Sequence, residues 1–518
     1  MRILCFKKLF FMVFFLFLLS VSTAFSRTRT LFRLTLSDAV LLAMRFNTNV
    51  QSEDLQRLID RMTLATAEWG YGIQYSLTAT VSYNRPVSAG VPTYSENDSI
   101  VPGATLLTPI GTQLSVQMTN PVTNGTGTGR SYNPSVTFSL TQPLLRGAGP
   151  SIALAPLYQA RNNETINKLT YKNNLMTTVT AVVNAWLSYI LAENSLKAQK
   201  ISLKSSIKTL EQQEAFLKVG RIAPTDLIQF KASVASQRLS LSQQEVSLGQ
   251  QKRALLITLG LNPDMPVEIS DEINFPGPSA PPPLGECIKA TFANNIPYQQ
   301  SLINLKNTEI SLHVTEDSAR WQLNLTAART QGPGPNPGLI QLTNGRYSDT
   351  TYALSLSIPI DDVGLNNTVS QARISLHQQK IALEQNRLQL KSTVINAWNT
   401  VISQREQIKQ ANEAVRLAKN SLDIAETKLR FGKVTPFEVS TLQTNLLTQQ
   451  LSAINVQISY FDNLATLDQT IGTTLERWKL EFRPDPGISQ AMDKADPELP
   501  TVPHEMISDI KEIKLTGS

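Results

Sequence analysis

The sequence has little charge, few cysteines and histidines, and no long apolar run after its start. Charged residues make up 17% of the 518, below the roughly 25% of average soluble domains, while apolar residues make up 41%. This balance excludes bulk intrinsic disorder. The two cysteines exclude a disulfide scaffold, and the three histidines make a His-rich metal site improbable. No stretch after residue 26 approaches the ~20 apolar residues of a spanning helix, which excludes a polytopic helical membrane protein.

Motifs of catalysis are also missing. The chain lacks a Gly-x-x-x-x-Gly-Lys-Ser/Thr loop, a His-Glu-x-x-His helix, a Gly-x-Ser-x-Gly turn and a cysteine cluster. We therefore expect no enzyme, no cofactor and no metal. The basic pI of about 9.1 could suggest a nucleic-acid partner. Half of the formal +6 charge lies in the first 26 residues, however, and neither helix–helix turn discussed below carries a basic patch without acids close by, so no nucleic acid is expected.

Residues 1–26 have the pattern of a signal peptide. A basic start with Arg2, Lys7 and Lys8 precedes the apolar run Leu9–Leu19, and Ala24-Phe25-Ser26 offers a small-residue cleavage site. A membrane anchor is the alternative, but the run is shorter than the ~17 residues that a spanning helix needs. Cleavage after Ser26 would leave Cys287 as the one mature cysteine, so the exported chain would depend on packing for its stability.

The rest of the chain contains two segments with similar sequence patterns. At an offset of 212, Leu217-Lys-Val-Gly220-Arg-Ile-Ala-Pro224-Thr-Asp226 aligns with Leu429-Arg-Phe-Gly432-Lys-Val-Thr-Pro436-Phe-Glu438. The same offset aligns Trp186 with Trp398 and Leu259-Gly260 with Ile471-Gly472. Agreement of rare residues at one shift predicts an internal structural repeat.

The predicted organisation follows from this repeat. The first repeat covers 27–262, with an equatorial helix, strands 73–84 and 134–142, and long helices 160–219 and 225–260. A Pro-rich linker covers 263–284. The second repeat covers 285–476, with an equatorial helix, strands 321–328 and 351–358, and long helices 372–431 and 437–472. The remainder, 477–518, is expected to be a flexible tail.

The predicted strands alternate between apolar and uncharged polar residues. In 73–84, Tyr75, Leu77 and Val81 alternate with Ser and Thr, and an exposed soluble strand would usually carry Lys or Glu instead. This pattern favours transmembrane β-strands that line water, with a soluble β-sandwich as the alternative. The chain must return to the periplasmic side before each pair of long helices, so each half needs an even number of crossings. We therefore assign the third alternating segment of the first half, 112–119, to an extracellular extension. Four strands per chain cannot close a barrel, so the barrel must be shared between chains.

The long helices carry a heptad seam. Apolar or small residues recur in steps of three and four from Val394 to Leu429, and from Val182 to Leu217 in the first repeat, which is typical of coiled coils. Helices of about 60 residues would be nearly 90 Å long at about 1.5 Å per residue. Gly220 and Gly432 suit helix ends, and Asp226 and Glu438 suit the first turn of the next helix, so simple capping is one complete explanation of these residues.

Four local motifs accompany this layout: Leu36-Ser-Asp-Ala-Val with Phe46-Asn47, Ser139-Leu-Thr-Gln-Pro-Leu-Leu-Arg-Gly147, the two Gly-x-x-x-Pro-x-acid turns, and the two closing Leu/Ile-Gly pairs. In this layout and in these motifs the sequence resembles the TolC-type outer-membrane efflux factor family. The resemblance implies an α+β membrane protein: a homotrimer with a 12-stranded transmembrane β-barrel, four strands per chain, continued by a long periplasmic α-helical barrel. It also implies location in the outer membrane and a passive duct docked to a periplasmic adaptor (membrane fusion) protein and an inner-membrane RND or ABC pump.

The resemblance also implies roles for the two turns at the periplasmic tip. Adaptor contact would involve Gly220, Arg221, Ile222, Ala223, Gly432, Lys433, Val434 and Thr435. Asp226 and Glu438 would form carboxylate rings that constrict the duct and favour cations. The polar links that hold the tip closed in some members are absent, because the corresponding positions hold Leu429 and Val434, and a second acidic ring is replaced by Thr441. Arg221, Arg430 or Lys433 could pair with the two acids instead.

Two functions are therefore compared. The first is an exit duct of a tripartite efflux or type I secretion system. The alternative is a trimeric outer-membrane structural or adhesin protein with a coiled-coil stalk, although such a stalk would not fold back and repeat.

Overall fold

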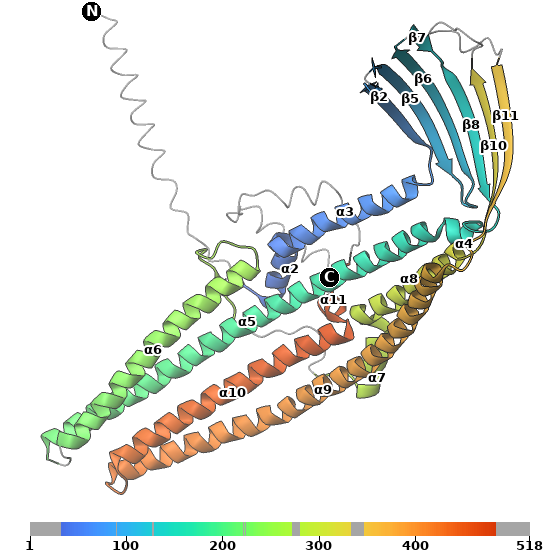
Figure 1. Ribbon diagram of the computed structural model, residues 1–518. Helices are drawn as coiled ribbons and strands as arrows, with labels where there is room; N and C mark the ends of the chain where they lie inside the picture. Colours follow the sequence, from blue (N-terminus) through green and yellow to red (C-terminus); the bar gives the residue numbers. More distant parts are fainter. Residues whose placement is uncertain are drawn as a thin grey trace, which may run out of the picture.

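A computed structural model gives the fold. It describes residues 33–482 except 90, 127–128, 221, 223, 272–279 and 333–346. The predicted signal peptide and most of the predicted tail lie outside the described residues. A curved β-sheet lies at one end of the molecule, and long helices run away from it (Figure 1). The predicted α+β class is therefore the observed one.

The sheet is larger than the sequence predicts. Its six long strands are β2 (Gln74–Asn84), β5 (Ser95–Leu107), β6 (Gln113–Gly125), β8 (Ser135–Pro143), β10 (Gln322–Gly332) and β11 (Tyr347–Ser357). They are antiparallel neighbours in the order β11-β10-β8-β6-β5-β2, and the short β7 (Gly129–Tyr132) pairs with β6. Two-residue strands form two small ladders: β1 (Arg33–Leu34) with β9 (Glu268–Ile269), and β3 (Val87–Ser88) with β4 (Val91–Pro92).

The expectation of four strands per chain was wrong, and a 12-stranded trimer no longer follows from it. Strand β5 was missed because Glu96, Asp98, Pro102 and Gly103 break its period of two. Segment 112–119 is not an extension outside the sheet. It belongs to β6, which pairs with β8 from Gln113↔Thr141 to Thr119↔Ser135.

The pairing register separates the side chains of the sheet into two faces. Directly paired residues share a face. One face is apolar and includes Leu77, Leu106, Val116, Phe138 and Leu354; the other carries mainly Ser, Thr, Gln and Asn. The charged side chains of the six long strands are Glu96, Asp98, Arg329 and Asp349, all toward the strand ends distant from the helices.

The helices of the first half are α2 (Leu36–Phe46), α3 (Thr48–Trp69), α4 (Pro150–Ala153), α5 (Ala155–Lys218) and α6 (Pro224–Thr258). Those of the second half are α7 (Leu284–Asn294), α8 (Ile296–Ser318), α9 (Val363–Arg430), α10 (Pro436–Ile471) and α11 (Thr474–Arg477). Each half thus has two helices before its first long strand, where the sequence predicted one equatorial helix. A break at Asn47 and at Asn295 separates them, and each of these residues caps the following helix.

The main core lies where α2 and α6 pack against the middle of α5. Leu36, Val183, Trp186 and Leu256 are fully buried there. One 18-residue window of α5 is long and apolar enough to cross a membrane, but 61% of it is buried inside the molecule, as in a core helix. The heptad seam is the inward face of the long helices: Val182, Tyr189, Leu196 and Leu203 are buried in α5, and Val394, Val401, Ala418 and Leu422 in α9.

The same junction occurs in both halves. The Asn47 side chain donates a hydrogen bond to the Thr258 carbonyl (2.6 Å), and the Asn295 side chain donates to the Thr470 carbonyl (2.9 Å). Gly260 and Gly472 follow with φ of +74° and +87°, and a Cβ at either would lie 2.0 Å from the Phe46 oxygen or 2.5 Å from the Asn294 oxygen. The closing glycines of the sequence motif are therefore required by positive φ and by close backbone contact.

Candidate functional site: the helix turns and the sheet

The second helix–helix turn is built by a glycine end and a threonine cap. Helix α9 ends at Arg430, and Gly432, with φ +67°, donates its N–H to the Leu429 carbonyl (2.9 Å) while Lys433 donates to Lys428 (3.0 Å). This pattern closes a helix with a left-handed residue, for which glycine is preferred. The Thr435 hydroxyl then accepts the Glu438 N–H (3.3 Å) and caps α10.

The first turn follows the same outline. Helix α5 ends at Lys218, and Gly220, with φ +74°, donates to the Leu217 carbonyl (3.0 Å). Of the other predicted contact residues, Ile222 is half-buried, whereas Arg221 and Ala223 lie outside the described residues. Asp226 lies in the first turn of α6, but its side chain is not among those described.

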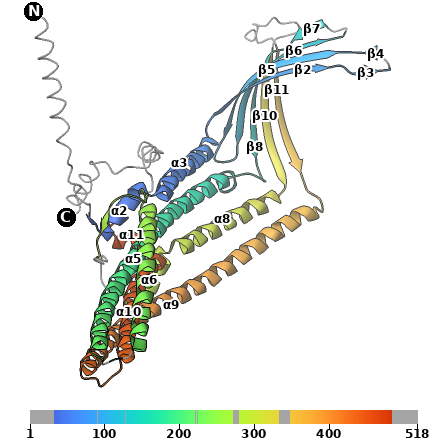
Figure 2. The same ribbon diagram turned by 90° about the vertical axis from the view of Figure 1, so that its left-hand side faces the viewer.

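Both turns lie at the end of the molecule farthest from the sheet (Figures 1 and 2). Gly432, Lys433 and Thr435 are exposed, and no atom lies within 4 Å of a Cβ built on Gly220 or Gly432. Val434 is half-buried because it packs against the small core of Leu422, Ala425 and Val439. The predicted contact residues described here therefore form an accessible, structurally repeated end of the helices.

Glu438 is exposed at the third position of α10. In the described part of the chain, neither Arg430 nor Lys433 forms an ion pair with it, so the pairing considered from sequence is not seen for these residues. Its position fits the capping explanation, since an acid in the first turn interacts favourably with the helix dipole.

A buried polar network joins the two helix hairpins above the turns. Gln443 of α10, 5% exposed, donates to the Ser205 and Thr209 hydroxyls of α5 at 3.2 and 3.0 Å. The Ser206 hydroxyl donates to Gln443 at 3.4 Å and accepts from Gln237 of α6 at 2.9 Å. Sequence reasoning missed this network, because Ser206 fits the seam as a small residue and gives no local sign of a polar contact.

The polar face of the sheet carries cross-strand hydroxyl pairs. The Oγ atoms of Ser115 and Ser139 lie 2.5 Å apart, those of Thr119 and Ser135 2.7 Å, and those of Thr137 and Thr330 3.1 Å. These pairs satisfy one another, and the charged residue of this face is Asp349, which is paired with Thr330 toward the strand end distant from the helices. Such a surface is wetted but binds no ion strongly.

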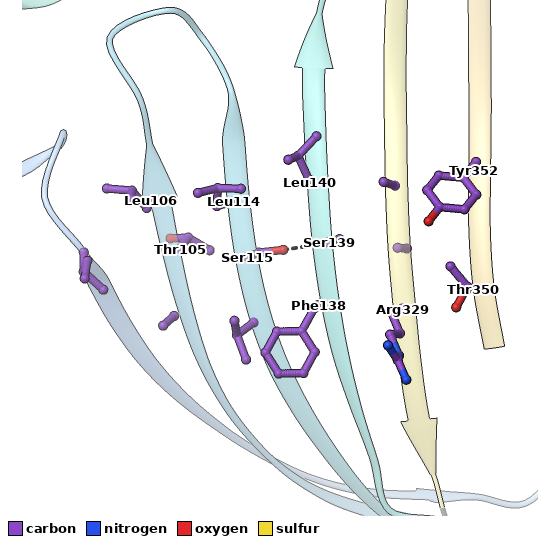
Figure 3. Close-up of a pocket in the computed structure, with 15 residues that line it drawn as sticks. Thr105, Leu106, Leu114, Ser115, Phe138, Ser139, Leu140, Arg329, Thr350 and Tyr352 are labelled. Atoms are coloured by element: carbon purple, nitrogen blue, oxygen red, sulfur yellow. Dashed lines mark hydrogen bonds between the residues drawn. The ribbon is translucent and has the colours of Figure 1, made fainter. Parts of the chain in front are cut away.

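The apolar face carries a shallow pocket across the strands (Figure 3). Leu106, Leu114 and Leu140 stand in one row, and Phe138, Arg329 and Thr350 in the next. Arg329 is the charged residue of the lining. An apolar surface open over several strands suits contact with lipid better than enclosure of a small ligand.

The described residues contain no group of three or more His, Cys, Asp or Glu side chains that could hold a metal ion. Burial and the nearby Asp468 carboxylate raise the pKa of the Cys287 thiol, which keeps it protonated. Burial likewise raises the pKa of Asp468 to about 6, against the opposing effect of Arg477.

A known protein family and several solved structures resemble this chain. Residues 314–473 match the model of the family described as outer membrane efflux protein. The resemblance predicted from the motifs is confirmed. No curated protein matches the chain.

Solved structures share the fold over most of the chain. The Campylobacter jejuni CmeC outer membrane channel is 13% identical with a TM-score of 0.66, covering 90% of this chain and 90% of its own. VceC from Vibrio cholerae is 14% identical with a TM-score of 0.65, covering 84% and 96%. The open state of the Neisseria gonorrhoeae MtrE outer membrane channel is 15% identical with a TM-score of 0.60, covering 85% and 90%. At these identities the likeness establishes the fold.

Proposed function

We propose that the chain forms a passive outer-membrane exit duct of an efflux or type I secretion system. The observation that supports this proposal is a two-faced β-sheet that continues into long helices within one chain. Strands of 9–13 residues have one apolar and one hydroxyl-rich face, as transmembrane strands do. They continue into helices of 64 and 68 residues, about 100 Å at about 1.5 Å per residue, long enough for a periplasmic tube. The family match supports the same function.

The duct needs several copies of the chain. Six strands are fewer than the eight of the smallest barrels, so one chain cannot close the sheet. A homotrimer is the proposed assembly, with the sheets in outer-membrane lipid and the helices in the periplasm.

The turns at Gly220 and Gly432 are the proposed contact with a periplasmic adaptor protein, and an RND or ABC pump in the inner membrane would supply substrate. Gly220, Ile222, Gly432, Lys433, Val434 and Thr435 form the described part of this surface; Arg221 and Ala223 complete it in sequence. Asp226 and Glu438 are the proposed constriction, each forming a ring of three carboxylates in a trimer.

The adhesin alternative is less well supported. A stalk needs one helix direction per chain, whereas α5–α6 and α9–α10 are antiparallel hairpins that return to the middle of the molecule (Figure 2). No residue set in the described chain favours catalysis.

Conductance tests the duct directly. The purified protein in planar bilayers should show a cation-preferring conductance. The double variant Asp226→Asn with Glu438→Gln should reduce that preference, because it removes both carboxylate rings. Unchanged selectivity would leave the two acids as helix caps, and absence of any conductance would contradict the duct itself.

Substitution of the tip glycines tests adaptor contact. Gly220→Trp and Gly432→Trp should abolish export by the assembled system while trimers still insert, since both positions are open to solvent. Gly285→Trp, at another open position, is the matched control. Export that persists in the tip variants would exclude the two turns as the docking surface.

A further inference from the structure

We propose that β5 and β6 are membrane-crossing strands of the duct, so that three chains close an 18-stranded barrel wide enough for large hydrophilic solutes. This inference rests on the proposed trimeric duct. It differs from the four strands per chain that the sequence motifs led us to expect.

Strand β5 is paired on both sides over most of its length, with a gap in its pairing to β6 at Val101 and Pro102. Strand β5 pairs with β2 from Gln74↔Thr105 to Asn84↔Ser95, and with β6 from Leu107↔Gln113 to Ser95↔Gly125. The two strands therefore separate β2 from β8, which would be neighbours in a four-stranded arrangement. All six strands start or end at the same level next to the helices (Figure 1).

The turn between β5 and β6 is fixed to the helical part of the molecule. Gly149, at the start of α4, donates its N–H to the Ile110 carbonyl (3.1 Å), and Thr112 forms a side-chain hydrogen bond with Gln142 of β8. Gly111 has φ +89°, and a Cβ there would lie 2.6 Å from the Gly147 carbonyl oxygen. The hairpin thus reaches the same boundary as the strands that enter and leave the helices.

The two strands also have the two-faced chemistry of their neighbours. Ile100, Leu106, Leu114, Val116 and Met118 lie on the apolar face, whereas Ser99, Thr105, Ser115, Gln117 and Thr119 lie on the polar face. Their acids, Glu96 and Asp98, share the apolar face with Tyr83 and Val81, but at the end distant from the helices, where charge meets water. A hairpin outside the membrane would not need the apolar band that runs from Ile100 to Leu106 and from Leu114 to Met118.

The free edges show how copies would join. Within the described chain, β2 and β11 each have one unpaired side, and their apolar residues are widely exposed: Leu77 72%, Val81 80%, Tyr352 77% and Leu354 66%. Unpaired backbone groups are very costly in lipid. The two edges run in opposite directions, so β11 of one copy can pair antiparallel with β2 of the next, and three copies close the ring.

Strand number sets the width. With strands about 4.8 Å apart and tilted about 40°, 18 strands give a backbone radius of about 18 Å, against about 12 Å for 12 strands. Barrels of 16–18 strands leave an aqueous channel. The hydroxyl-rich lining, with Asp349 of each copy near the strand end distant from the helices, would then pass large hydrophilic solutes.

Disulfide formation tests the strand order. In a Cys287→Ala background, Ser115→Cys with Ser139→Cys should cross-link β6 to β8 in outer-membrane trimers, because the two hydroxyls are in contact. Val116→Cys with Ser139→Cys is the matched control and should not cross-link, since these residues lie on opposite faces. Peptide mass spectrometry reads both. Absence of the first link, or a link between Thr78→Cys and Thr137→Cys, would overturn the inference by placing β2 beside β8.

Polymer access tests the width. Ser139→Cys, on the polar face of β8, is labelled in intact cells with maleimide–polyethylene glycol of increasing size. The full chain should admit polymers of about 1.5-fold larger radius than a variant that lacks Ser95–Gly125, following the ratio of the two radii. Equal limits, in two variants that both insert, would overturn the wider lumen.

The outcomes separate the inference from the proposed function. If the full chain gives no conductance, the duct is wrong. If it conducts but the β6–β8 link does not form, the duct stands and the 18-stranded barrel is wrong.

Discussion

The contact between α3 and α5 in the first half and the contact between α8 and α9 in the second half differ in chemistry. In the first, Arg57 makes a two-armed ion pair with Glu164 (2.8 and 3.1 Å), and the Tyr171 hydroxyl donates to Asp54 (2.5 Å). At the repeat offsets, the equivalent residues of the second half are leucines: Leu305 and Leu376 for the ion pair, Leu302 and Leu383 for the hydroxyl pair. One surface pair is kept in both halves, Arg161–Glu68 (3.2 Å) and Arg373–Glu316 (2.9 Å).

The leucines at the equivalent positions of the second half show that this helix packing does not require a buried ion pair. The Arg57 and Glu164 side chains are 1% and 8% exposed, so both ions have lost most of their hydration. Replacement of such a pair by apolar residues is often neutral or stabilising, whereas removal of one partner is strongly destabilising. The ion pair therefore specifies the contact of the first half more than it strengthens it.

The largest expected effect comes from removing one partner of the buried ion pair. Glu164→Gln should destabilise the protein in detergent by about 3–5 kcal/mol, because Arg57 stays buried without its main counterion. Thermal unfolding followed by circular dichroism measures it. The double variant Arg57→Leu with Glu164→Leu copies the second half and should recover most of the loss. Arg373→Gln, at the exposed pair, should cost less than about 1 kcal/mol. A double variant as unstable as Glu164→Gln would contradict the comparison.

The second prediction concerns the glycine junction that occurs in both halves. Gly260→Ala and Gly472→Ala should each destabilise by more than about 2 kcal/mol, since a Cβ would both require a strained φ and collide with backbone oxygen. Gly220→Ala has the same sign of φ but open space, and should cost only about 1 kcal/mol. Similar losses for all three would show that φ alone, and not the junction, sets the requirement.

The smallest effect concerns a charge found only in the second half. Asp468, paired with Arg477, corresponds to Leu256 of the first half. Because its folded pKa, about 6, is raised above its ordinary value near 4, the folded state binds the proton more tightly than the unfolded state. Relative to Asp468→Asn, the native chain should therefore gain about 1 kcal/mol on going from pH 7 to pH 5, and lose it as pH rises through 6. A difference that does not change with pH would exclude this titration.

Local patterns predicted much of the fold. The heptad steps identified the buried faces of α5 and α9, because a helical stripe follows directly from residue spacing. The glycines at 220 and 432 marked the helix ends for the same local reason. Alternation found β2 and parts of β6, β8, β10 and β11, but not β5, because Pro102 and Gly103 interrupt its strand pattern and its place between β2 and β6 depends on long-range pairing.

By itself, then, the sequence determined the long seamed helices, the glycine turns and the two-faced strands, since each depends on residues close together in the chain. Only the tertiary structure decided which distant residues meet. It placed Asn47 against Thr258, Arg57 against Glu164, and the β5–β6 hairpin between β2 and β8. These contacts join segments up to about two hundred residues apart, and their energy comes from burial and pairing that no local pattern encodes.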